Sequence, residues 1–126
     1  MVSKAGQGEK SILIVDNQPA ESAQLGKQLS YAGFRVTSVT TGEGAIKKMG
    51  GPGADVILLE VELSDMDGLN VVSFVRNEPR VRHTPIVAMS AFPHRKDRCL
   101  EGGCDGFVQK PVRILDLVAH IRRLTR

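Results

Sequence analysis

The feature that most constrains this chain is a regular alternation of short apolar runs with longer amphipathic segments, repeated five times. The runs at 12–15 and 56–59 are apolar without a break. Uninterrupted runs of this length are typical of parallel strands buried on both faces. The pattern predicts strands at 11–15, 34–39, 55–60, 85–90 and 106–109, and helices at 19–31, 42–49, 68–77, 93–100 and 112–124. It therefore indicates the α/β class.

Strands that alternate with helices form a parallel sheet with helices on both faces. Crossovers between parallel strands are right-handed, which leaves few possible topologies. The pattern favours a flavodoxin-like (βα)5 doubly wound parallel sheet with strand order 2-1-3-4-5. Ligands bind such sheets beyond the carboxyl ends of the strands, where the first and third strands diverge. A functional site is therefore expected at that edge.

A length of 126 residues fits one domain, which we place at residues 11–126. Residues 1–10 are polar and glycine-bearing, so we expect a flexible N-terminal tail there. The sequence has no apolar run of about 18 residues, and no membrane span is predicted. Cys99 and Cys104 lie outside any metal-ligand pattern and are interpreted as reduced thiols of a cytoplasmic protein.

Four of the predicted strands end in a polar side chain. Asp16 follows the first strand, Glu60 ends the third, Ser90 ends the fourth and Lys110 follows the fifth. Because the carboxyl ends of parallel strands meet at one edge, these side chains should lie close together. The pair Asp67-Gly68 opens the helix that follows Glu60.

This order of carboxylate, carboxylate, hydroxyl and lysine resembles the phosphoacceptor site of two-component receiver domains, the CheY-like family. The resemblance covers residues 12–124 and implies the fold given above. It implies that position 60 accepts a phosphoryl group, that Lys110 contacts this group, and that Ser90 bonds it as a switch. Phe107 matches the aromatic partner of the switch, and Lys110-Pro111 matches a pair that is often cis.

The resemblance also implies a site for Mg²⁺, which favours oxygen ligands. Its ligands would be Asp16, Glu60, the backbone carbonyl of Glu62 and, weakly, Asn17. The family usually has a second acidic residue where Asn17 stands. Asparagine offers a carbonyl oxygen without a charge, so Mg²⁺ binding is expected to be weak.

Glu60 departs from the family, which has aspartate at this position. The extra methylene moves the carboxylate about 1.5 Å further into the pocket. Misplacement of a reacting atom by roughly 1 Å already slows a reaction strongly. Three interpretations remain open: Glu60 permanently mimics phosphoaspartate, the site is held inactive, or the residue is an engineered Asp→Glu change.

We therefore expect a receiver module of two-component signal transduction that acts by protein–protein interaction and not as an enzyme. It would work independently of phosphorylation, as a pseudo-receiver or through a phosphomimetic Glu60. The alternative is a conventional phosphorelay receiver that accepts a phosphoryl group from a histidine kinase, at Glu60 or at a neighbour such as Asp65. A second alternative is a basic module that binds nucleic acid.

Charge is distributed unevenly along the chain. Residues 1–75 carry 6 Lys and Arg against 9 Asp and Glu, whereas residues 76–126 carry 11 against 5. The basic half includes the predicted output face on the fourth helix, fifth strand and fifth helix, with Arg95, Lys96, Arg98, Arg113 and Arg122. A histidine kinase or another signalling protein would bind there, to a monomer or weak dimer. The absence of Trp, with one Tyr and four Phe, argues against stacking on nucleic-acid bases.

Overall fold

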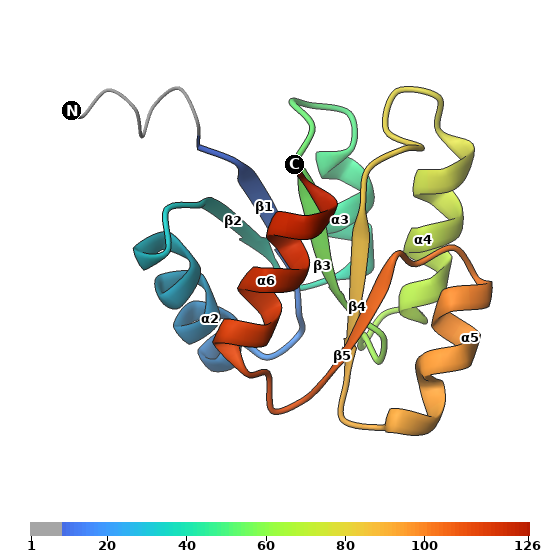
Figure 1. Ribbon diagram of the computed structural model, residues 1–126. Coiled ribbons are helices and arrows are strands. Elements are labelled where there is room, and N and C mark those ends of the chain that lie inside the picture. The colour runs from blue at the N-terminus through green and yellow to red at the C-terminus, as the bar shows by residue number, and fades with distance from the viewer. Residues whose placement is uncertain (1–8) are drawn as a thin grey trace.

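The protein forms a five-stranded parallel sheet with helices on both faces (Figure 1). The structure is a computed structural model that describes residues 9–126. The strands are β1 (Ser11–Val15), β2 (Arg35–Val39), β3 (Val56–Glu60), β4 (Ile86–Ser90) and β5 (Gly106–Gln109), in the order β2-β1-β3-β4-β5. All neighbouring pairs are parallel, so the predicted flavodoxin-like topology is confirmed.

The helices follow the predicted ranges to within two residues, except that α5 begins three residues later than predicted. They are α2 (Pro19–Tyr31), α3 (Gly42–Lys48), α4 (Gly68–Asn77), α5 (Lys96–Glu101) and α6 (Ile114–Leu124). One predicted helix, 93–100, begins as a separate 3₁₀ turn, η1 (Pro93–Arg95). In this turn the Arg95 amide donates a 3.1 Å hydrogen bond to the Phe92 carbonyl, the i to i+3 pattern of a 3₁₀ helix.

Each face of the sheet has its own hydrophobic core, because alternate side chains of a strand point to opposite faces. On one face Ile14 and Leu58 pack with Leu29 of α2 and Ile121 of α6. On the other face the strands pack against α3, α4 and α5; the buried residues there include Val15, Ala45, Leu59, Val72 and Cys99. Figure 1 shows α2 and α6 in front of the sheet. The two layers hold the strand ends in fixed positions.

The segment before β1 is joined to the edge strand. Of the predicted tail at 1–10, residues 1–8 lie outside the described part of the chain. The carbonyl of Lys10 accepts a 2.9 Å hydrogen bond from the Arg35 amide, and Glu9 lies 3.4 Å from the Arg35 side chain. Within residues 9–126, no helix combines the length and the apolar character that crossing a bilayer requires.

Gly68, the first residue of α4, is packed tightly against the end of β3. A Cβ atom at this position would lie 2.6 Å from the carbonyl oxygen of Glu60 and 2.9 Å from the Cα of Val61. Both are backbone atoms that cannot rotate away. Gly68→Ala should therefore lower the free energy of unfolding by about 2 kcal/mol, measured by chemical denaturation.

The matched control for this substitution is Gly53→Ala. A Cβ at Gly53 meets no atom within 4 Å, so this variant should unfold close to the parent. Equal losses in the two variants would contradict the proposed contact between Gly68 and the end of β3.

Candidate functional site at the carboxyl ends of the strands

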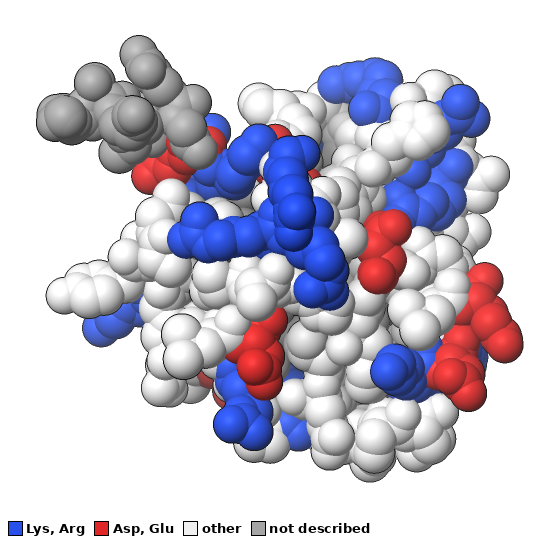
Figure 2. All heavy atoms as spheres, in the orientation of Figure 1, with Lys and Arg blue, Asp and Glu red and all other residues white. Residues whose placement is uncertain are grey.

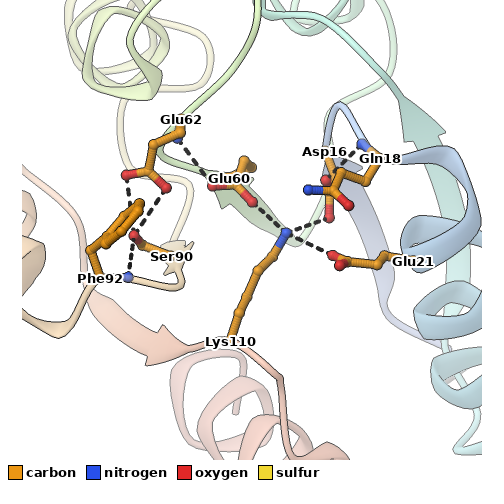
Figure 3. A network of polar contacts seen from close by, with 8 residues as sticks. All are labelled: Asp16, Gln18, Glu21, Glu60, Glu62, Ser90, Phe92 and Lys110. Carbon is orange, nitrogen blue, oxygen red and sulfur yellow. Dashed lines mark hydrogen bonds and ion pairs between the residues drawn. The ribbon is translucent and has the colours of Figure 1, made fainter.

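Three charged side chains from separate strands meet at one edge of the sheet (Figure 3). Asp16 directly follows β1, and Glu60 is the last residue of the adjacent β3. Lys110 follows β5, and its amide donates a 2.8 Å hydrogen bond to the carbonyl of Ser90. The sheet order therefore brings together residues that lie up to 94 positions apart in the sequence.

Lys110 is the centre of this group. Its Nζ lies 3.1 Å from Oδ2 of Asp16 and 3.0 Å from Oε1 of Glu21, and it also contacts Oε1 of Glu60. Burial by itself would lower the pKa of Lys110, but hydrogen bonds to the three carboxylates outweigh it and raise the pKa above its ordinary value. The ammonium therefore stays charged and shared among three acids.

Glu60 uses both of its carboxylate oxygens within the protein. One contacts Lys110, and the other accepts a 3.1 Å hydrogen bond from the Glu62 amide. Only 4% of the residue is exposed. This burial raises the pKa of Glu60 above its ordinary value, although the hydrogen bond from Lys110 opposes the rise.

Ser90 is bonded to Glu62 and not to Glu60. Its Oγ lies 3.0 and 3.1 Å from the two carboxylate oxygens of Glu62, and it accepts a 3.0 Å hydrogen bond from the Phe92 amide. Nε of Arg95 lies 2.8 Å from the same Glu62 carboxylate. Because the Nε–H bond does not point at this oxygen, the contact is an ion pair without an aligned hydrogen bond.

An open cleft of about 450 Å³ lies beside these side chains. Its lining includes Asn17, the predicted weak metal ligand, together with Glu60, Glu62 and Lys110. Asn17 is half-buried at the end of β1. Phe107, the predicted partner of the switch, is half-buried and packs against the core under α3, α4 and α5. The peptide bond between Lys110 and Pro111 is cis.

Sequence reasoning missed two contributors to the site. Glu21, in the first turn of α2, reaches Lys110. The side chain of Glu62, for which only a backbone role was predicted, holds Ser90. Glu21 could have been suspected from its place one turn into the helix that follows Asp16, whereas no local signal identifies the side-chain role of Glu62.

Asp65, the alternative phosphoacceptor, bonds the start of α3. Its carboxylate accepts hydrogen bonds of 2.9 and 3.0 Å from the amides of Gly42 and Glu43 at the start of α3. These two bonds lower the pKa of Asp65 below its ordinary value. The structure thus shows Asp65 as a cap of a neighbouring helix.

The five predicted output residues have different neighbours in the structure. Arg98 lies 2.6 Å from Asp67 and Arg113 lies 3.7 Å from Asp116, while Lys96 is exposed at the start of α5. Arg122 instead donates to the carbonyl of Ala32 and lies over the ring of Phe34, beside the end of α2. Figure 2 shows Lys and Arg side chains gathered over the C-terminal end of α6.

The site has oxygen donors of the kind that Mg²⁺ prefers, in the carboxylates of Asp16 and Glu60. They are few, since no cluster of three or more Asp, Glu, His or Cys side chains within residues 9–126 could hold a metal ion. Both carboxylates also contact Lys110. The residues fit Mg²⁺ in chemical type, with Asn17 and the Glu62 carbonyl as neutral donors nearby.

Comparison with known proteins identifies the family. The response regulator receiver domain matches residues 12–122. This chain belongs to the response regulator receiver family. Response regulator PleD of Caulobacter vibrioides is 34% identical over 117 residues, which are 91% of this chain and 26% of PleD. Two-component response regulator ORR11 of rice (Oryza sativa) is 31% identical over 119 residues, 92% of this chain and 81% of that protein.

Solved receiver structures agree with this assignment. The receiver domain of the sensor histidine kinase PA1611 of Pseudomonas aeruginosa has a TM-score of 0.86 at 28% identity, covering 93% of this chain and 98% of that one. That structure has a magnesium ion coordinated in its active site cleft. A two-component response regulator of Clostridium difficile has a TM-score of 0.85 at 29% identity, with 92% and 95% covered. The present chain is thus a receiver module of two-component signalling, and it spans about a quarter of PleD.

Lys110→Met tests how strongly the receiver fold depends on this ion cluster. The change leaves the buried carboxylates of Asp16 and Glu60 without their cation, so the free energy of unfolding should fall by about 3 kcal/mol at neutral pH. Loss of the cation also raises the pKa of Glu60 further above 4.5. Between pH 4.5 and that raised value, the folded variant binds more protons than the unfolded chain.

The stability lost in Lys110→Met should therefore be partly regained as the pH falls through this window. Denaturation curves at several pH values measure the effect. Lys27→Met, which changes an exposed lysine of α2, is the matched control and should alter stability little at any pH. A Lys110→Met loss that does not vary with pH would contradict the assigned pairing.

Proposed function

We propose that this receiver works independently of phosphorylation and acts by binding other proteins, without catalytic turnover. The observation that carries the proposal is the pairing of Glu60 with Lys110. In the receiver chemistry implied by the sequence, the residue at position 60 attacks phosphorus while Lys110 neutralises the phosphoryl oxygens. In this protein the Glu60 carboxylate and the Lys110 ammonium are already paired with each other.

The geometry of Glu60 supports this proposal. An attacking carboxylate needs an oxygen that can approach phosphorus, but one oxygen contacts Lys110 and the other accepts the Glu62 amide. Freeing an oxygen breaks a contact inside a site where Glu60 is 4% exposed. Such charge-assisted contacts are stronger when they are shielded from water. The longer side chain therefore bonds within the protein instead of serving as a nucleophile.

The charge of the cleft supports the proposal as well. Three glutamates and one lysine line it: Glu21, Glu60, Glu62 and Lys110. A phosphoryl donor is an anion and would approach like charges at close range. In contrast, a carboxylate held against Lys110 supplies the negative charge that a phosphoryl group would otherwise bring. We propose that Glu60 acts in this way, as a permanent and weak phosphomimetic.

Partner proteins would bind the surface of α5, β5 and the N-terminal part of α6. The exposed cations there are Lys96, Arg98 and Arg113, so an acidic surface of a histidine kinase or another signalling protein is the expected partner. This binding of a partner protein would take place in the cytoplasm. Arg122 is left out of this surface because it packs toward α2.

Phosphorylation is tested by intact-mass spectrometry after incubation with Mg²⁺ and a small phosphoryl donor. The parent should gain no phosphoryl group, while Glu60→Asp, which shortens the side chain, should gain one. Glu60→Gln keeps the length without a nucleophile and serves as the control. A phosphorylated parent would instead support the conventional phosphorelay function, and the modified residue would then be mapped.

Mg²⁺ binding is proposed to be weak. A bound ion would be held by Asp16 and Glu60 and would neutralise negative charge beside residue 60. Asn17→Asp should tighten binding more than tenfold, since another unit charge beside a divalent ion is worth on the order of 2 kcal/mol even with the screening of water. Isothermal titration of parent and variant with MgCl₂ measures this. Equal affinities would show that Asn17 does not limit the site.

A further inference from the structure

The carboxylate of Glu62 accepts the hydrogen bond of the Ser90 hydroxyl, the predicted switch of this receiver. We infer that Glu62 is a built-in ligand of Ser90, which locks η1 and α5 in one arrangement and keeps an incoming phosphoryl group from the hydroxyl. This inference rests on the proposed phosphorylation-independent function, which it extends by naming the residue that replaces the phosphoryl group at Ser90.

The first support is that the hydroxyl of Ser90 is fully engaged. Ser90 is completely buried, and its single proton is directed to the Glu62 carboxylate at 3.0 and 3.1 Å. Its oxygen accepts the Phe92 amide at 3.0 Å. A hydroxyl offers one donor, so a phosphoryl group at residue 60 could bond Ser90 only after Glu62 moved away.

The second support is that Glu62 is itself held in place. Arg95, the last residue of η1, lies 2.8 Å from its carboxylate. The amide of Glu62 is fixed by the bond to Glu60. Glu62 therefore links three groups of the site, namely the phosphoacceptor position, the switch hydroxyl and the segment that opens α5.

A second ion pair joins the same two segments. Asp67, in the loop between β3 and α4, lies 2.6 Å from Arg98 of α5. Its carboxylate also accepts the Leu69 amide as the cap of α4, which fixes it in position. The loop after β3 is thus joined to η1 and α5 at two points, through Glu62 and through Asp67. Removal of Glu62 should loosen η1 first and leave the other contact in place.

The primary test is amide hydrogen exchange, measured without any phosphoryl donor. Glu62→Ala removes the hydroxyl partner and the ion pair, so exchange across residues 92–101 should accelerate about tenfold or more. Ser90→Ala should accelerate the same segment as well, because it removes the bond to Glu62 together with the bond from the Phe92 amide. Exchange in α2 should stay within twofold of the parent.

The matched control is Glu43→Ala, which changes an exposed glutamate of α3 whose nearest cation, Lys47, lies 4.0 Å away. It should leave residues 92–101 unchanged. Exchange in this segment that stays within twofold of the parent in Glu62→Ala would overturn the inference. Because no phosphorylation is involved, this result does not depend on the outcome of the Glu60→Asp experiment.

A second measurement, the rate of phosphoryl uptake, tests whether Glu62 blocks the Ser90 hydroxyl or only stabilises η1 and α5. In the Glu60→Asp background, Glu62→Gln keeps the size of the side chain but removes its charge, and it should accelerate uptake of a phosphoryl group several-fold. Glu43→Gln in the same background should not change the rate. An unchanged rate with Glu62→Gln would show that Glu62 does not keep phosphoryl groups from the switch.

Discussion

The ammonium of Lys110 is the interaction on which the functional edge of this receiver depends. It joins Asp16 at the end of β1, Glu60 at the end of β3 and Glu21 in the first turn of α2. Buried charges are tolerated only when they are paired, so these carboxylates and this cation require one another. The pairing explains how three charged side chains can be buried or half-buried at the carboxyl ends of the strands, beside two apolar cores.

The loop between β3 and α4 carries three carboxylates that contact other parts of the structure. Glu62 holds Ser90 and Arg95, Asp65 caps α3, and Asp67 caps α4 while pairing with Arg98. An isolated antiparallel β-bridge between the backbones of Glu62 and Asp67 joins the two sides of this loop. Each carboxylate thus contacts a different element, and the loop connects Glu60 to the proposed output surface.

Much of the fold could be predicted from the chain because its signals are local. Short runs that are apolar or that alternate apolar with polar residues predicted all five strands, and the crossover rule then favoured their order. One boundary shifted: the predicted helix at 93–100 begins as the separate 3₁₀ turn η1, and α5 starts at Lys96. The site was predicted less completely. Asp16, Glu60 and Lys110 end strands that must meet, whereas the contact between Arg122 and Ala32 depends on how α6 packs against α2.

The sequence by itself determined the class, the topology and the edge at which the site lies, because strand ends in a parallel sheet are fixed by periodicity and handedness. It also places a glutamate, Glu60, at the end of the third strand. Only the tertiary structure decided what each carboxylate bonds. Glu60 pairs with Lys110 and Glu62 pairs with Ser90, which lie on or next to different strands. The distances between such side chains are set by packing of the whole sheet and its helices, and no local pattern encodes them.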